Sequence, residues 1–153
     1  MDALELMKSD HAAVKKLLER GDKTTEQATK TRQELFDTIK TELGAHEAME
    51  EEIFYPALKE HPKAKDIVLE AYEEHHVVNT VMGELERTPV DDETWGAKFT
   101  VMKENLEHHI EEEEGEMFKQ ARSVFDRDEL QELGQRMQAR KEQVLSELKA
   151  AAS

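Results

Sequence analysis

Apolar residues recur every three or four positions along most of this chain, the spacing that places them on one face of an α-helix. Glycine, proline and paired aspartates interrupt the pattern at four places. Between these breaks the pattern predicts five helices, over residues 2–20, 23–59, 63–87, 91–121 and 127–150. Because the connections between them are short, we expect successive helices to be antiparallel neighbours.

The predicted fold class is therefore all-α. We expect an antiparallel up-down-up-down four-helix bundle over about residues 2–121 and an additional C-terminal helix over about 127–150. A length of 153 residues suits a single domain, residues 1–153. The last helix has an apolar stripe of its own, so it either packs on the bundle, which we favour, or pairs two chains. The protein is thus expected to be a monomer or a weak homodimer.

Each of the first four predicted helices carries a stripe that is apolar except near its middle. There a histidine replaces an apolar residue, and on the second and fourth helices a glutamate follows four residues later. These polar stripe residues are His11, His46, Glu50, His75, His109 and Glu113. Beyond Glu50 the same spacing predicts that Ile53 and Ala57 face the core.

The two halves of the bundle repeat one another. His11 and His75 are 64 residues apart, and His46-Glu50 and His109-Glu113 are offset by 63 residues. Each half is thus a helical hairpin with a histidine on its first helix and the motif HxxxE on its second. A two-fold arrangement of the hairpins would bring both sets to one level of the bundle.

Composition narrows the function classes. Charged residues make up 37% of the chain, and the net charge of −15 repels phosphate backbones and anionic lipid. We therefore expect no nucleic acid and no membrane as partner. The chain has no cysteine, which excludes disulfides and thiol chemistry. The N-terminal residues lack the apolar segment of a signal peptide, and no stretch approaches the roughly 18 apolar residues of a membrane span, so a cytoplasmic location is expected.

Buried carboxylates in an apolar bundle need a compensating positive charge. No lysine or arginine lies on the four stripes to pair with Glu50 or Glu113, and a bound cation would serve instead. Neutral imidazole together with carboxylate suits iron, manganese or zinc. Residues at i and i+4 share a helix face, so each HxxxE motif can present two ligands. Six ligands are too many for one tetrahedral zinc but suit two metal ions that share bridging carboxylates.

Simpler interpretations exist for each residue. A single histidine on an apolar stripe is more often a core residue, and an acidic helix produces HxxxE by chance. A plain acidic bundle that picks up divalent ions incidentally remains a third interpretation of the whole chain. The four central histidines in repeated order favour a real site. The remaining polar residues of these segments are predicted to lie mainly at the surface, namely His61, His76, His108, Glu111, Glu112 and Glu114.

The order H…HxxxE…H…HxxxE resembles the hemerythrin-like, HHE cation-binding family. The resemblance rests on DHAAVKKLL (10–18), HEAMEEEIFYPAL (46–58), EEHHVV (73–78) and HHIEEEEGEMF (108–118), and it covers roughly residues 5–121. It implies a four-helix bundle around an oxo- or hydroxo-bridged pair of non-haem iron ions. Family members bind O2 reversibly, sense oxygen or iron, or act on peroxide and nitric oxide.

Two positions depart from the pattern of the O2-carrying members. Those proteins have a second histidine four residues after the third-helix histidine, where this chain has Asn79. The fourth-helix carboxylate is a glutamate at +4 rather than an aspartate at +5. The set is thus one ligand short, and Tyr55, Tyr72 or water could supply a seventh. The repeat aligns Tyr55 with Phe118, which favours Tyr55, although nine residues after His46 it needs a distorted turn to face inward.

The function that this resemblance implies is redox chemistry on peroxide or nitric oxide, catalase-like or peroxidase-like, at the di-iron centre. The ligand would be a small diatomic molecule or peroxide. The alternative is reversible binding of O2 or nitric oxide, or the sensing or storage of oxygen or iron, without turnover.

Overall fold

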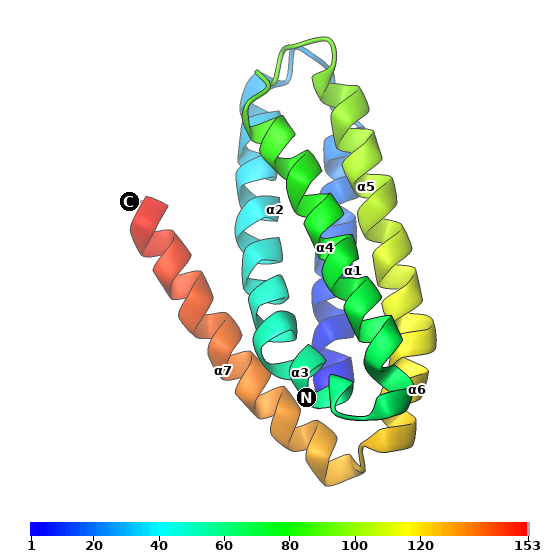
Figure 1. Cartoon of the computed structure of the whole chain (residues 1–153). Helices are drawn as coiled ribbons and strands as arrows, with labels where there is room; N and C mark the ends of the chain where they lie inside the picture. The colour runs from blue at the N-terminus through cyan, green and yellow to red at the C-terminus, as the bar shows by residue number, and fades with distance from the viewer. Residues whose placement is uncertain (153) are drawn as a thin grey trace.

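Four long helices run antiparallel, and a fifth crosses them obliquely (Figure 1). The computed structural model describes residues 1–152, so residue 153 of the expected domain lies outside the described part. The first helix is α1 (Ala3–Asp22), and the second begins as α2 (Thr29–Met49), passes through the π-helical turn η1 (Glu50–Phe54) and ends as α3 (Tyr55–Lys59).

A 3₁₀ turn, η2 (Pro62–Ala64), leads into α4 (Lys65–Glu86). The fourth long helix again has a π turn, because α5 (Trp95–Glu112) continues through η3 (Glu113–Met117) into α6 (Phe118–Val124). The crossing helix is α7 (Arg127–Ala152). The described residues contain no strand, so the all-α bundle with an additional C-terminal helix is confirmed. None of these helices is long and apolar enough to cross a membrane.

Two helix starts differ from the prediction. The second helix begins at residue 29 rather than 23, because residues 23–28 form turns that Arg32 holds in place. The Arg32 guanidinium donates to the side chain of Thr24 at 2.9 Å and to the Val90 carbonyl at 2.6 Å, and it lies 4.5 Å above the ring of Trp95. This buried cation ties together the two loops at one end of the bundle. The helix predicted from 91 begins at Trp95, after an aspartate turn.

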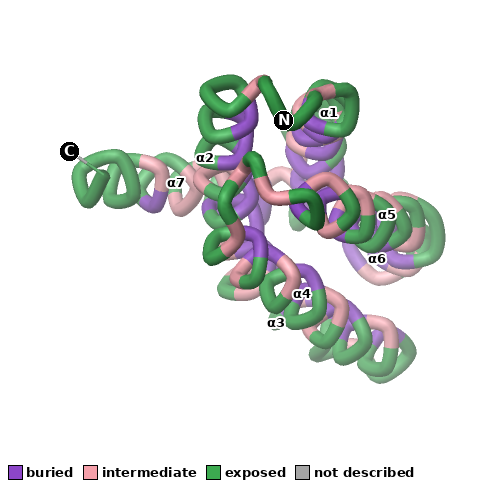
Figure 2. Tube along the Cα trace, turned by 90° about the horizontal axis from the view of Figure 1, so that it is seen from above, coloured by how far each residue is buried: buried purple, intermediate pink, exposed green. Residues whose placement is uncertain are grey.

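The apolar core has two parts, separated by a polar layer. One part lies at the end where α7 crosses and contains Met7, Met49, Ala71 and Met117, with their neighbours. The other fills the opposite end and contains Val14, Leu43, Val78 and Leu106, among others. On every long helix of the bundle, the predicted histidine lies between these two parts. Buried positions follow the inward faces of the helices (Figure 2).

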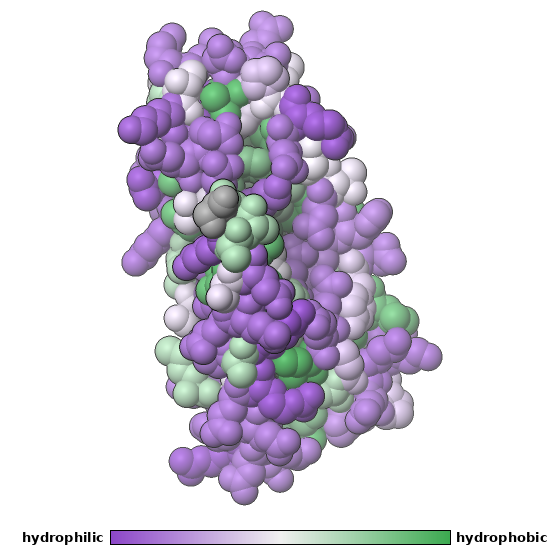
Figure 3. All heavy atoms as spheres, turned by 90° about the vertical axis from the view of Figure 1, so that its left-hand side faces the viewer, coloured by the Kyte–Doolittle hydropathy of each residue, from purple (hydrophilic) through white to green (hydrophobic). Residues whose placement is uncertain are grey.

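The C-terminal helix packs on the bundle, as its apolar stripe predicts. Leu130, Leu133, Met137 and Val144 are buried against it. Its start is fixed by a reciprocal cap, in which the Asp126 side chain accepts from the backbone of Glu129 while the Glu129 side chain accepts from the backbone of Asp126. The outer face of this side of the molecule is mostly hydrophilic, with apolar residues in small separate areas (Figure 3).

Gly134 lets α7 cross the start of α1 at backbone contact. A Cβ added there would lie 2.5 Å from the carbonyl oxygen of Met1 and within 2.8 Å of the backbone of Asp2 and Ala3. Those atoms belong to the capped first turn of α1, so they cannot move without cost to the cap. The position therefore needs a residue without a side chain.

We expect Gly134→Ala to lower the free energy of unfolding by roughly 1–3 kcal/mol, the usual cost of overpacking. Gly115→Ala is the matched control, because a Cβ at Gly115 meets nothing within 4 Å. Denaturant unfolding of both variants measures the difference. A Gly134→Ala protein as stable as Gly115→Ala would contradict this account of the crossing.

Candidate metal centre

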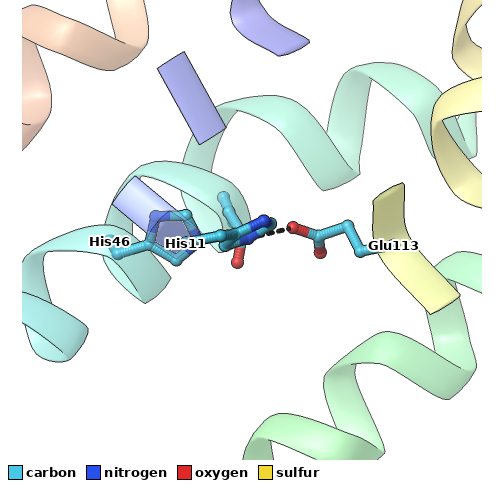
Figure 4. Close-up of side chains that lie close together, drawn as sticks. His11, His46 and Glu113 are labelled. Carbon is cyan, nitrogen blue, oxygen red and sulfur yellow. Dashed lines mark ion pairs between the residues drawn. The ribbon is translucent and has the colours of Figure 1, made fainter. Parts of the chain in front are cut away.

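The six polar stripe residues converge in the layer between the two apolar cores. Each has 5% or less of its surface exposed. The histidines come from α1, α2, α4 and α5, and the two glutamates are the first residues of the two π turns. Figure 4 shows His11 and His46 side by side, with His11 directed at Glu113. The sequence pattern thus identified residues that the fold does bring together.

The ligand atoms form two groups that share both carboxylates. In the first group are His11, His46, Glu50 and Glu113, and in the second His75, His109 and the same two glutamates. Within each group the donor atoms all lie within 4.8 Å of one another. Each group can therefore surround one metal ion.

Each glutamate directs one oxygen at each group. Glu50 has Oε2 3.2 Å from Nε2 of His46 and Oε1 3.2 Å from Nε2 of His75. Glu113 does the same, with Oε1 3.1 Å from Nε2 of His11 and Oε2 3.3 Å from Nε2 of His109. This is the arrangement that two bridging carboxylates need between two ions.

Several of these inward atoms are fully buried and, despite the short distances given above, make no hydrogen bond. They are Nε2 of His11, Oε2 of Glu50 and Oε1 of Glu113, all in the first group. A buried polar atom without a partner is costly in a folded protein. The donor set of imidazole nitrogen and carboxylate oxygen suits a first-row transition metal at this position. The residues therefore fit a metal ion.

The two π turns determine which side chains after Glu50 and Glu113 point into the bundle. A π turn holds one residue more than an α turn, and here the N–H of Tyr55 bonds to the carbonyl of Glu50. Residues five apart then share a face, so Phe54 and Tyr55 are fully buried. Ile53 and Ala57, which the spacing predicted to face the core, do pack against it but are only half-buried for this reason. The distorted turn that an inward Tyr55 requires is therefore present.

The hydroxyl of Tyr55 lies inside the second group. It donates to Oε2 of Glu113 at 2.5 Å and lies 3.2 Å and 3.4 Å from Nε2 of His75 and His109. The hydroxyl of Tyr72 instead donates to a backbone carbonyl, that of Glu51. Of the two tyrosines considered, the fold brings only Tyr55 to the centre.

Phe118, the counterpart of Tyr55 in the repeat, lies beside the first group. Its ring stacks on that of His11, with centroids 6.5 Å apart. The two groups thus differ, because one faces a hydroxyl and the other faces a hydrocarbon ring. Asn79, which stands where the O2 carriers have a histidine, is exposed and donates to Glu47 rather than entering the layer.

Every inward histidine is held from outside by a carboxylate on its Nδ1. His46 pairs with Asp10 at 2.9 Å and His109 with Glu74 at 2.8 Å. The other two pairs cross between the halves of the repeat, His75 with Glu51 at 3.0 Å and His11 with Glu114 at 2.7 Å. A carboxylate on Nδ1 leaves Nε2 free to bind a metal and fixes the ring orientation.

These outer carboxylates were not singled out from the sequence, and Glu114 was wrongly expected to be solvated. A signal was available, because each of the four adjoins a candidate ligand in the sequence. Asp10 directly precedes His11, and Glu74 directly precedes His75. Glu51 and Glu114 directly follow the glutamates of the two HxxxE motifs. The repeat therefore includes the outer residues as well as the inner ones. As expected, His76 and His108 are exposed, whereas His61 is half-buried with its ring against Phe125.

Protons supply the missing positive charge when no ion is bound. Burial alone would lower the pKa of His46, but the charge of Glu50 and the hydrogen bond to Asp10 outweigh it and raise that pKa to about 10. The pKa values of His75 and His109 are also about 10, because hydrogen bonds to carboxylates overcome burial. Burial would raise the pKa of Glu113, yet its hydrogen bonds hold that pKa well below the usual range.

Comparisons with known proteins agree with this geometry. The sequence model of the hemerythrin HHE cation binding domain matches residues 2–121. Over 147 residues the chain is 33% identical to the uncharacterized protein Rv2633c of Mycobacterium tuberculosis (strain H37Rv) and to Mb2666c of Mycobacterium bovis, covering 94% of this chain and 88% of each relative. The chain therefore belongs to the hemerythrin HHE cation-binding domain family.

A solved structure extends the likeness to α7. The crystal structure of a hemerythrin HHE cation binding domain-containing protein from Mycobacterium kansasii, a homolog of Rv2633c, superposes with a TM-score of 0.86 and 31% identity. The match covers 96% of this chain and 89% of that one. The C-terminal helix thus belongs to the shared architecture, although the family model ends before it.

Because carboxylates raise the pKa of three of these histidines in the ion-free protein, metal ions compete with protons for the ring nitrogens. We expect the apparent affinity for a divalent metal ion to rise with pH between about pH 6 and 9, and binding to release protons. The sign follows from pKa values raised toward 10, because the competition from protons weakens as the pH rises through this range. Calorimetric titration of the ion-free protein in buffers of different ionisation enthalpy counts the protons. Affinity independent of pH would contradict this assignment.

Proposed function

We propose that the six residues hold two non-haem iron ions, joined by an oxo or hydroxo bridge. The observation that carries this proposal is the sharing of both carboxylates, with one oxygen of each directed at each group. Four imidazole nitrogens then complete the set, two for each ion. Family membership supports a cation site, and the mixed nitrogen and oxygen donors favour iron over calcium or magnesium.

We further propose that Tyr55 is the additional ligand. In the ion-free protein burial and the charges of Glu113 and Glu50 raise the pKa of Tyr55 well above 10, so it is a neutral hydroxyl. A trivalent ion in the second group would reverse this preference, because a cation favours the phenolate. Tyrosinate is an established iron ligand in other proteins. The proton that Tyr55 now donates to Glu113 would then leave the site, because Glu113 must stay ionised to bridge the two ions.

Phenolate on ferric iron gives a charge-transfer band in the visible spectrum. We expect this band in the oxidised protein and its loss in Tyr55→Phe, with two irons still bound. Tyr72→Phe is the matched control, because that ring contacts Tyr55 edge-on at 5.2 Å but its hydroxyl points to a backbone carbonyl. An unchanged spectrum in Tyr55→Phe would exclude this ligand.

The reaction that we propose is redox chemistry on peroxide or nitric oxide. Bound iron supplies the electron transfer, and disproportionation of two molecules of H2O2 to O2 and two of water needs no outside reductant. The chain contributes selection by size, because ligand residues with at most 5% exposure admit small molecules such as peroxide or a diatomic gas. The outer carboxylates hold the imidazole rings in place.

Iron-loaded protein should evolve O2 from H2O2, and His109→Ala and Glu113→Ala should lose this activity together with bound iron. His108→Ala is the matched control, since His108 is the sequence neighbour of His109 but is exposed and pairs only with Glu112 in the described part of the chain. An oxygen electrode and elemental analysis give both readouts. If wild-type protein with two bound irons reacts with neither peroxide nor nitric oxide, the proposed enzyme activity is wrong.

Binding without turnover is the second candidate, as reversible O2 or nitric oxide binding, or as sensing or storage of oxygen or iron. The same burial favours it, because a carrier must keep bulk water from its ions. Mixing the reduced protein with O2 distinguishes the two. A spectrum that reverts when O2 is removed supports binding, and immediate irreversible oxidation supports redox chemistry.

We propose that the protein acts as a monomer or a weak homodimer. The apolar stripe of α7 is used within the chain, and the face on which α7 lies shows only small apolar areas (Figure 3).

A further inference from the structure

Asp10 is held by two partners on opposite sides. Its Oδ2 accepts from Nδ1 of His46 at 2.9 Å, and its Oδ1 accepts from Nζ of Lys141 at 2.6 Å. The side chains of Asp10 and Lys141 are only 11% and 16% exposed. A continuous set of hydrogen bonds thus runs from α7 through α1 to a histidine of the centre.

The other three outer carboxylates lack such a partner. Within the described residues no lysine or arginine nitrogen lies within 4 Å of Glu51, Glu74 or Glu114. By the repeat, Asp10 corresponds to Glu74, and α7 has no counterpart in either half. Lys141 therefore breaks the two-fold symmetry of the outer shell at one corner.

The charge of Lys141 acts on the electrons of His46. A carboxylate that accepts a hydrogen bond from Nδ1–H makes Nε2 of the same ring a stronger electron donor to a metal. A cation on the other oxygen of that carboxylate offsets part of its charge, and it does so at low local dielectric because the pair is mostly buried. His46 is then a weaker donor than it would be with Asp10 alone.

We propose that Lys141 is a positioning residue that acts through Asp10 to weaken electron donation from His46, so that the ion of the first group is the more easily reduced of the two. This proposal rests on the proposed function, since it needs ions at the centre. It also gives the C-terminal helix a role in the chemistry of a site to which it contributes no ligand.

The surroundings make Lys141 suitable for substitution. The pair lies in an open groove of about 820 Å³ between α1, α2 and α7, lined also by Ala13, Leu17 and Glu42. A shortened or uncharged side chain there leaves no hole in the packed core. Arg140, the preceding residue, provides the control, because it pairs with exposed Glu52, which touches none of the six residues of the centre in the contacts described.

The test compares Lys141→Met, Lys141→Arg and Arg140→Gln, all loaded with iron, by spectroelectrochemical measurement of the reduction potential. We expect a shift to lower potential in Lys141→Met, recovery of most of it in Lys141→Arg, and the wild-type value in Arg140→Gln. In an Asp10→Asn background, Lys141→Met should have no further effect. Lys141→Gln replaces Lys141→Met if the latter does not fold.

Two results would overturn the inference. One is a reduction potential in iron-loaded Lys141→Met equal to that of the wild type. Lys141 would then only hold α7 in place. The other is an equal shift in Arg140→Gln, which would make the effect one of general charge. Elemental analysis separates these failures from that of the proposed function, because wild-type protein that binds no iron pair overturns both at once.

Discussion

Two carboxylates placed inside an apolar bundle constrain everything else at the centre. Glu50 and Glu113 are fully buried, and no lysine or arginine reaches them among the residues described. Four histidines surround them, and without an ion three of these gain pKa values near 10, so protons provide the compensation. Such a site suits positive charge, and in the proposed function a pair of metal ions sharing both carboxylates would supply it.

The π turns determine which side chains lie around the two carboxylates. Each begins at one of the two glutamates, and the extra residue in the turn rotates the following side chains inward. In one half this delivers Tyr55 to the second group, and in the other it delivers Phe118 beside the first. A two-fold framework thus encloses two chemically different places. The contact of Lys141 with Asp10 adds a second difference from outside.

The sequence predicted the helices and the six inward residues because both follow from strict three-and-four spacing and a 63-residue repeat. It did not predict what departs from an ideal helix. The π turns bury Phe54 and Tyr55 fully and leave Ile53 and Ala57 half-buried at the edge of the core. The outer carboxylates were missed because Glu114 lies in an acidic run, where spacing alone does not separate a hydrogen-bonded residue from a solvated one. The turn before Thr29 depends on Arg32, whose partners lie in distant loops.

The proposed function requires two ions that share both carboxylates. Anaerobic titration of the metal-free protein with ferrous iron, followed by oxidation and Mössbauer spectroscopy, tests it most directly. We predict an end point of two irons per chain and an oxidised pair that is diamagnetic at low temperature through coupling across the bridge. A single iron per chain, or two irons with independent paramagnetic spectra, would contradict it.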